Sequence, residues 1–225
     1  MIIRTFYNDQ QISVPNGLTT LEEFRKWIYS DGYPEHALVS YIHGDVEVDM
    51  SPEKAESHNQ VKSAVNNVLG PLVERLDSGR YYPDGLWLTS DLAGLSTEPD
   101  GTFATWETLT TRRAYIAPSN DEVRGGIEMR GTPDWVMEVV SDSSVRKDSV
   151  LLLDAYYAAG IREYWLIDAR HGELAFTVYT RALGGFDSVS PVDGWSRSTV
   201  FEREFRFTKS KDRLGGVRFG LECRD

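Results

Sequence analysis

Residues 131–168 read GTPDWVMEVVSDSSVRKDSVLLLDAYYAAGIREYWLID, and this stretch decides the fold. Residues 135–140 form a nearly continuous apolar run, which is typical of an inner strand covered on both faces. Residues 164–168 form a second apolar run. Between the two runs, Asp148 is a candidate helix cap, apolar residues recur at helical spacing, and Gly160 supplies a stop. The order strand, helix, strand predicts a right-handed parallel crossover.

Two further elements precede this unit. Alternating residues predict a β-hairpin over residues 37–48, with its turn at Gly44-Asp45. A long helix is predicted over residues 53–76, beginning near Ser51-Pro52. Its apolar positions recur at helical spacing: Val61, Val65, Val68, Leu72 and Leu76. Short strands are expected at residues 86–88, 102–105, 126–130 and 174–179, and a loop at residues 107–120.

The chain is expected to divide into a main domain at residues 36–182 and two flanking parts. Residues 1–35 are predicted to be an extension with one short helix at 21–28, capped by Thr19 or Thr20. Residues 183–225 are predicted to form short β pieces and a polar tail. The order of elements predicts an α/β fold, in which helices flank a mixed β-sheet.

Composition limits the possible functions. The 225 residues are 40% hydrophobic and 12% aromatic, so the chain should fold around a real core. A net charge of -11 excludes a basic nucleic-acid coat protein but leaves room for an enzyme that meets DNA through a local basic patch and metal ions. One cysteine, Cys223, excludes an intrachain disulfide and paired-cysteine zinc sites. With no leader-like start and no apolar run of roughly 18 residues, the expected location is cytoplasmic.

Glu138 is the residue that first indicates chemistry. It interrupts an apolar strand and should point to the same face as Val136, because side chains alternate along a strand. A buried carboxylate is normally neutralised, paired or bound to a metal. One interpretation is therefore an ion pair with Arg130 or Arg162.

The other interpretation of Glu138 is a metal site shared with upstream acids. Asp100 precedes a short strand, and Asp45 and Glu47 lie on the predicted hairpin. Carboxylates that converge from neighbouring strands suit Mg²⁺ or Mn²⁺. Asp100 also has a plain interpretation, because Pro-Asp-Gly is a good turn sequence. Asp84 stands in the same triplet with no assigned role.

The chain resembles the Uma2 family of restriction endonucleases, in the PD-(D/E)xK nuclease superfamily. Residues 131–148 and 156–168 carry the resemblance, which covers about residues 37–180. Earlier motifs agree in order: Gly44-Asp45, Met50-Ser51-Pro52, His58 and Pro99-Asp100. The resemblance implies a restriction-endonuclease-like fold, metal-assisted phosphodiester hydrolysis and Mg²⁺ as the cofactor, with Mn²⁺ as a substitute.

The family pattern also implies roles for individual residues. Asp100 and Glu138 would be catalytic metal ligands, and the carbonyl of Val139 could complete the shell. His58 would lie at the mouth of the site with a hairpin acid, Asp45 or Glu47. The plain alternative for His58 is a polar residue on the exposed side of a helix start.

The sequence departs from the family pattern at the catalytic lysine. The Glu-x-Lys half-motif would place it at position 140, which is Val140. Many relatives carry it one turn after the aspartate that matches Asp148, and here that position is Leu152. Lys147 is the nearest candidate to replace it, with a solvated loop charge as the alternative.

Three functions stay open at this stage. They are a metal-dependent endonuclease acting on nucleic acid, with DNA expected first; a nuclease fold kept for binding or assembly; and a metal-dependent phosphoesterase for small substrates. A cluster of basic residues around Asp100 and Glu138 would favour nucleic acid, whereas scatter would favour the other two. The candidates are Arg112, Arg113, Arg124, Arg146, Lys147 and Arg162. A homodimer is expected only by analogy with nucleases that cut both strands.

Overall fold

The computed structural model describes residues 3–7, 10–15, 17–34, 38–49, 54–118, 126–170 and 173–225. Its centre is the strand–helix–strand unit that the sequence predicts. β11 (Trp135–Val139) and β12 (Glu163–Asp168) are adjacent and parallel. A π-helical turn, η2 (Lys147–Leu151), and α4 (Leu152–Ala158) connect them. Gly160 has a φ of 86°, the left-handed conformation that ends a helix. The predicted parallel crossover is confirmed.

The described strands form two six-stranded sheets, together with a two-stranded and a three-stranded one. The sheet around β11 has the order β14-β13-β12-β11-β8-β5, and its other strands are β5 (Gly79–Tyr82), β8 (Gly101–Thr105), β13 (Ala175–Arg181) and β14 (Phe186–Ser188). The other sheet has the order β4-β3-β7-β6-β10-β9. Its strands are β3 (Leu38–Ile42), β4 (Asp45–Asp49), β6 (Trp87–Ser90), β7 (Leu95–Thr97), β9 (Ala114–Ile116) and β10 (Glu128–Gly131).

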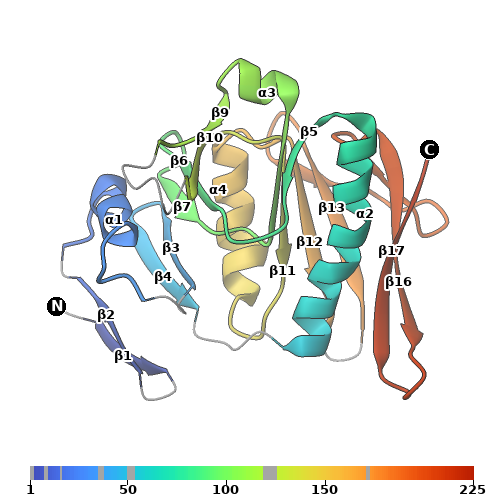
Figure 1. The fold of residues 1–225 in the computed structure, drawn as a ribbon, viewed down its shortest axis with the longest axis horizontal. Helices are drawn as coiled ribbons and strands as arrows, with labels where there is room; N and C mark the ends of the chain where they lie inside the picture. The colour runs from blue at the N-terminus through green and yellow to red at the C-terminus, as the bar shows by residue number, and fades with distance from the viewer. Residues whose placement is uncertain are drawn as a thin grey trace.

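Helices and sheets stack in layers (Figure 1). α4 lies between the two sheets, where Tyr156 packs with Leu88 of one sheet and Val136 of the other. The long helix α2 (Gln60–Leu76), preceded by the π-helical turn η1 (Ala55–Asn59), covers the opposite face of β11. α1 (Leu21–Ile28) covers the outer face of the sheet that contains β3 and β6, through Phe24 and neighbouring apolar residues. Side chains alternate along β11, so Glu138 lies on the face of Val136 as predicted, and this face is turned toward α4.

The N-terminal part contains the predicted helix and one hairpin that was not predicted. Thr20 caps α1, and Glu23 completes the capping box, so of the candidate caps Thr20 is the one used. β1 (Ile3–Tyr7) and β2 (Gln10–Val14) pair antiparallel. Arg25 of α1 makes two hydrogen bonds to the buried carboxylate of Glu128, which fixes the helix on the sheet.

One irregular segment is predicted wrongly, and the C-terminal β pieces are present but longer than predicted. The expected loop at residues 107–120 contains α3 (Trp106–Thr110) and β9. The expected short pieces after residue 183 include β15 (Ser196–Ser198) and a long hairpin of β16 (Arg203–Lys211) and β17 (Val217–Arg224). This hairpin packs Phe205 and Leu221 into the core beneath α2. Its aromatic residues alternate with charged ones, so the segment is polar on average although one face is buried.

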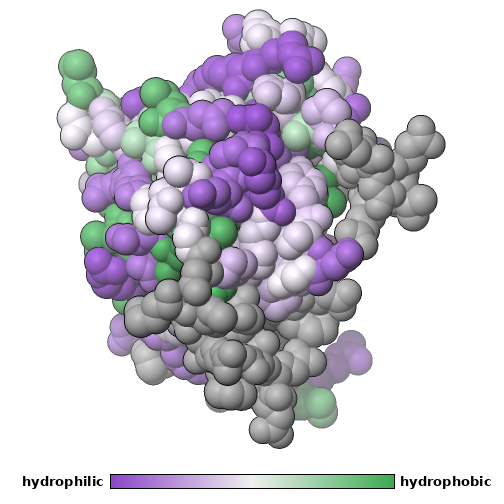
Figure 2. Space-filling view, turned by 90° about the vertical axis from the view of Figure 1, so that its left-hand side faces the viewer, coloured by the Kyte–Doolittle hydropathy of each residue, from purple (hydrophilic) through white to green (hydrophobic). Residues whose placement is uncertain are grey.

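Some predictions fall outside the described residues, among them the helix start at residues 51–53 and the position of Met50. Within the described part of the chain, none of the helices is both long and apolar enough to cross a membrane. Figure 2 shows that hydrophilic residues spread over the side of the molecule that carries α1, with apolar residues in small separate groups.

Candidate active site

Asp100 lies at the start of β8, beside the end of β11. It is 8% exposed, and its Oδ2 accepts a hydrogen bond of 2.7 Å from the backbone N–H of Val139. His58 Nε2 lies 3.5 Å from the same oxygen, and Lys62 Nζ lies 3.4 Å from Oδ1. Burial raises the pKa of Asp100, while the charges of His58 and Lys62 act in the opposite direction. Asp100 therefore does more than form a turn, because its carboxylate is buried and hydrogen-bonded inside the protein.

Glu138 is 3% exposed and faces the helix that follows its strand. The hydroxyl of Tyr156 on α4 donates a hydrogen bond of 2.5 Å to Glu138 Oε1. Burial raises the pKa of Glu138 well above its usual value; Lys147 opposes this, and the carboxylates of Asp148 and Asp100 add to it. The ion pair with Arg130 or Arg162 is not what the structure has, because these residues contact Asp91 and Asp134 instead.

Lys147 and Asp148 enter the same site from the start of the π-helical turn η2. Lys147 Nζ lies 3.5 Å from Asp148 Oδ1, and the two side chains are 13% and 2% exposed. Burial raises the pKa of Asp148 to about 6. Although burial acts against it, the carboxylates of Asp148 and Glu138 raise the pKa of Lys147 above its usual value. Lys147 is therefore a buried cation among carboxylates, and the alternative of a solvated loop charge is wrong.

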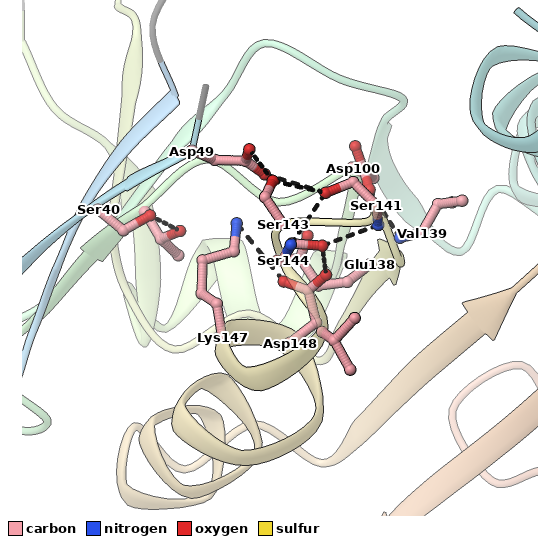
Figure 3. A network of polar contacts seen from close by, with 12 residues as sticks. Ser40, Asp49, Asp100, Glu138, Val139, Ser141, Ser143, Ser144, Lys147 and Asp148 are labelled. Atoms are coloured by element: carbon pink, nitrogen blue, oxygen red, sulfur yellow. Dashed lines mark hydrogen bonds and ion pairs between the residues drawn. The ribbon is translucent and has the colours of Figure 1, made fainter. Parts of the chain in front are cut away.

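These residues line one cavity of about 430 Å³. Figure 3 shows Asp100, Glu138, Lys147 and Asp148 pointing toward one another between the end of β11 and the beginning of the next helix. Both described π-helical turns contribute, because His58 lies in η1 and the Lys147-Asp148 pair in η2. Such turns occur frequently at functional sites, where they redirect side chains that a regular helix would place elsewhere. The lining also includes Leu38, Asp49, Asp84, Gly85, Glu98, Val139, Ser141 and Ser144.

A serine-rich loop joins the hairpin acid Asp49 to Asp148. Ser141 Oγ donates to Asp49 Oδ2 at 3.2 Å, and Ser143 Oγ donates to Asp49 Oδ1. Ser144 Oγ donates to Asp148 Oδ2 and accepts the backbone N–H of Ser141 at 2.8 Å. The loop therefore fixes both carboxylates at the rim of the cavity.

The structure brings most, but not all, of the predicted site residues together in the cavity. Asp100, Glu138, Val139, Lys147 and His58 all line the cavity, and His58 is only 6% exposed, so its exposed alternative is wrong.

Of the hairpin acids, the one that lines the cavity is Asp49 rather than Asp45 or Glu47. Asp45 is exposed beside the hairpin turn, and Glu47 lies 3.6 Å from Arg146. These three acids lie on one face of β4, so the strand pattern offers all of them equally.

Sequence reasoning missed two acids of the site. Asp148 was predicted to cap a helix, but it is a buried residue that lines the cavity. Its backbone N–H donates to the carbonyl of Ser144 at 2.7 Å. Asp49 could have been found as the third acid of the same alternating strand. Asp148 matches an aspartate of the family pattern, and this match could have indicated a site residue. In the sequence analysis it served only to locate the missing lysine.

Most of the basic residues expected near the cleft lie elsewhere. Arg113 and Arg162 contact Asp134, at the opposite end of β11. Arg112 stacks on a tyrosine ring, and Arg146 is exposed. Arg124 falls outside the described residues. Lys147 alone of the five described candidates lines the cavity.

Comparison with known protein families identifies the family of this chain. The model of a family described as "Uma2: putative restriction endonuclease" matches residues 21–208. The chain belongs to the Uma2 family. The Uma2 match starts at α1 and ends within β16, so it is wider than the resemblance that the motifs alone indicated.

A solved structure agrees with the Uma2 assignment. It is the crystal structure of a "putative nuclease belonging to DUF820" from Anabaena variabilis ATCC 29413, with a TM-score of 0.59 and 22% identity. The match covers 81% of this chain and 90% of that chain, and it confirms the predicted restriction-endonuclease-like α/β fold. No curated protein matches. Family and fold together are those of a nuclease-type enzyme.

The Uma2 fold implies a divalent cation, and the residues at the cavity fit one in part. Among the described residues, no three side chains of the His, Cys, Asp and Glu types converge closely enough to hold a metal ion by themselves. Mg²⁺, however, is commonly bound by one or two carboxylates, and water and substrate phosphate supply the other ligands. The raised pKa values of Asp100 and Glu138 indicate negative charge that a cation would stabilise. These two carboxylates and the carbonyl of Val139 are the groups that would hold such a cation, with water and substrate phosphate as its other ligands.

Proposed function

We propose that this protein is a metal-dependent endonuclease that hydrolyses phosphodiester bonds of nucleic acid, with DNA as the first candidate and Mg²⁺ as the cofactor. The observation that carries the proposal is the single cavity in which Asp100, Glu138 and Lys147 lie together. Two acids and a lysine at the end of a central strand are the groups that this reaction needs. Membership of the Uma2 family supports the same reaction class.

Each residue has a role that follows from its position. Asp100, Glu138 and the Val139 carbonyl would hold the cation, which when bound lowers the pKa of water and polarises the phosphoryl group. The Lys147 ammonium would orient the attacking water and balance charge on the phosphate oxygens. His58, 3.5 Å from Asp100, is the second candidate for proton transfer.

The experiment compares two neighbouring basic residues. Lys147→Ala is expected to reduce metal-dependent plasmid nicking by on the order of 10²-fold, because one positioned charge is lost. Its Mn²⁺ affinity in calorimetry should not fall, since an ammonium is no metal ligand. Arg146→Ala is the matched control, because Arg146 is 73% exposed and one residue away. If both variants nick at the wild-type rate, Lys147 has no role in catalysis.

One observation favours a second candidate function. Most of the basic residues expected at the cavity lie elsewhere and the net charge is -11, which does not favour tight binding of long nucleic acid through many phosphate contacts. A metal-dependent phosphoesterase for small substrates, or a binding module, fits this charge better. Cleavage of bis(p-nitrophenyl) phosphate without cleavage of any DNA or RNA would support the phosphoesterase. Metal binding without hydrolysis of either substrate would support the binding module.

A homodimer is part of the proposal only for cleavage of both DNA strands. Two copies would be needed to place two sites on opposite strands. Light scattering with and without duplex DNA measures this, and a monomer in both conditions would limit the enzyme to nicking.

A further inference from the structure

Lys62 is a buried lysine that contacts two residues of the cavity wall, Asp84 and Asp100, and the function above does not use it. It lies on α2, one turn after His58, and its side chain is only 8% exposed. Lysine is almost never this buried unless it is paired. Its neighbours on the helix, Val61 and Val65, are core residues, so the helical pattern gives no sign that a cation enters the protein here.

Two Pro-Asp-Gly turns place carboxylates on both sides of this ammonium. Lys62 Nζ donates a hydrogen bond of 2.8 Å to Asp84 Oδ2 and lies 3.4 Å from Asp100 Oδ1. Asp84 is half exposed, and its Oδ1 accepts the N–H of Gly85 at 3.0 Å. Both Pro-Asp-Gly triplets therefore contribute to this arrangement, because each supplies one carboxylate to Lys62.

The contacts of Asp100 show what this arrangement does to a metal ligand. Its Oδ2 is occupied by the Val139 N–H, and its Oδ1 faces Lys62. A cation that binds Asp100 must therefore share the carboxylate with a fixed positive charge. At this short range inside a protein, repulsion between two cations is large.

We propose that Lys62 is a positioning residue that neutralises Asp100 when no cation is bound and lowers the affinity of the site for divalent cations. Asp84 holds Lys62 and draws it away from Asp100. This inference rests on the proposed metal site. It implies that cation and substrate reinforce each other, because a phosphate supplies the negative charge that offsets Lys62.

The test is calorimetry with Mn²⁺ on the full chain, near pH 8.5 so that protons compete little for the carboxylates. Lys62→Met keeps the length of the side chain and removes the charge, and it should bind Mn²⁺ at least tenfold more tightly than wild type. Lys62→Arg keeps the charge and should stay within about threefold of wild type. Asp84→Asn should bind more weakly, since Lys62 then loses the carboxylate that competes with Asp100 for its ammonium.

A double-mutant cycle separates this idea from a general charge effect. If Asp84 acts through Lys62, Asp84→Asn should weaken Mn²⁺ binding much less in the Lys62→Met background than in wild type. Equal weakening in both backgrounds would overturn the inference. So would a Lys62→Met variant, folded by circular dichroism, that binds no more tightly than wild type.

Two further outcomes have definite meanings. If Lys62→Met does not fold, Lys62→Gln takes its place in the same cycle, with the same tighter binding expected. If wild type binds no Mn²⁺, the proposed metal site and this inference fail together, whereas normal wild-type binding with an unchanged Lys62 variant overturns the inference alone.

Discussion

Asp148→Asn should stabilise the metal-free protein, and the gain should depend on pH in a calculable way. Burial raises the pKa of Asp148 from 3.8 to about 6 in the folded protein. One pKa unit corresponds to about 1.4 kcal/mol, so the ionised side chain costs the fold about 3 kcal/mol above both pKa values. Asparagine has nearly the same shape and carries no charge at any pH.

The sign follows from proton linkage. Between pH 3.8 and about 6 the folded protein binds more protons at Asp148 than the unfolded chain does, so the free energy of unfolding falls as the pH rises through this window. Asp148→Asn removes this fall. It should therefore be more stable than wild type by up to about 3 kcal/mol near pH 8 and by only about 0.5 kcal/mol near pH 4.

Urea denaturation with a chelator present, at both pH values, measures this difference. Asp154→Asn is the matched control, because Asp154 lies on the same helical segment and is exposed. Its effect should be small and equal at both pH values. If Asp148→Asn is no more stable than wild type near pH 8, the cavity does not hold the excess negative charge that a cation would relieve.

Three further predictions concern buried hydrogen bonds, two in the surrounding fold and one at Glu138. Arg25→Ala leaves the buried carboxylate of Glu128 without its main partner and should lower the free energy of unfolding by about 3 kcal/mol, as urea denaturation would show. Glu163→Ala leaves several buried donors without their acceptor, among them the Trp165 indole N–H, which lies 2.7 Å from Glu163. It should lower the free energy of unfolding by about 3 kcal/mol or more in the same measurement. Tyr156→Phe removes the hydrogen bond that lowers the pKa of Glu138, so the pH at which Mn²⁺ begins to bind in calorimetry should shift upward. An unchanged onset would mean that Glu138 is not a ligand.

The sequence predicts the centre of the fold well because its signals are local and strong. Residues 135–140 and 164–168 are apolar throughout, and Gly160 ends the intervening helix in a conformation that glycine adopts without strain. Their parallel pairing follows because a single helix joins them, and consecutive strands usually lie next to each other. The C-terminal hairpin could not be predicted in the same way, because Phe205 and Leu221 are buried by residues far away in the sequence, among them Trp165 and the apolar face of α2.

The candidate site is harder to predict because its members come together only in three dimensions. Asp100 and Glu138 follow from family motifs, and both line the cavity. An aspartate at a helix start, such as Asp148, looks like a cap in sequence, and only the π-helical turn shows that it points inward. Lys62 gives no sequence signal, since a lysine beside apolar helix positions is usually a solvated residue.

The π-helical turn also gives a physical reason why Lys147 can stand in for a lysine at position 152. The backbone N–H of Leu152 donates to the carbonyl of Lys147, so the two residues are one wide turn apart along the same helix. Leu152 is fully buried between the two sheets, where a charged side chain would be costly. Moving the lysine back by one turn brings its ammonium to the open end of β11, beside Glu138 and Asp148. Leu152 then fills the apolar core behind the site while Lys147 supplies a cation to the cavity. Under the proposed function, Lys147 takes the role of the lysine that the family resemblance places at position 152.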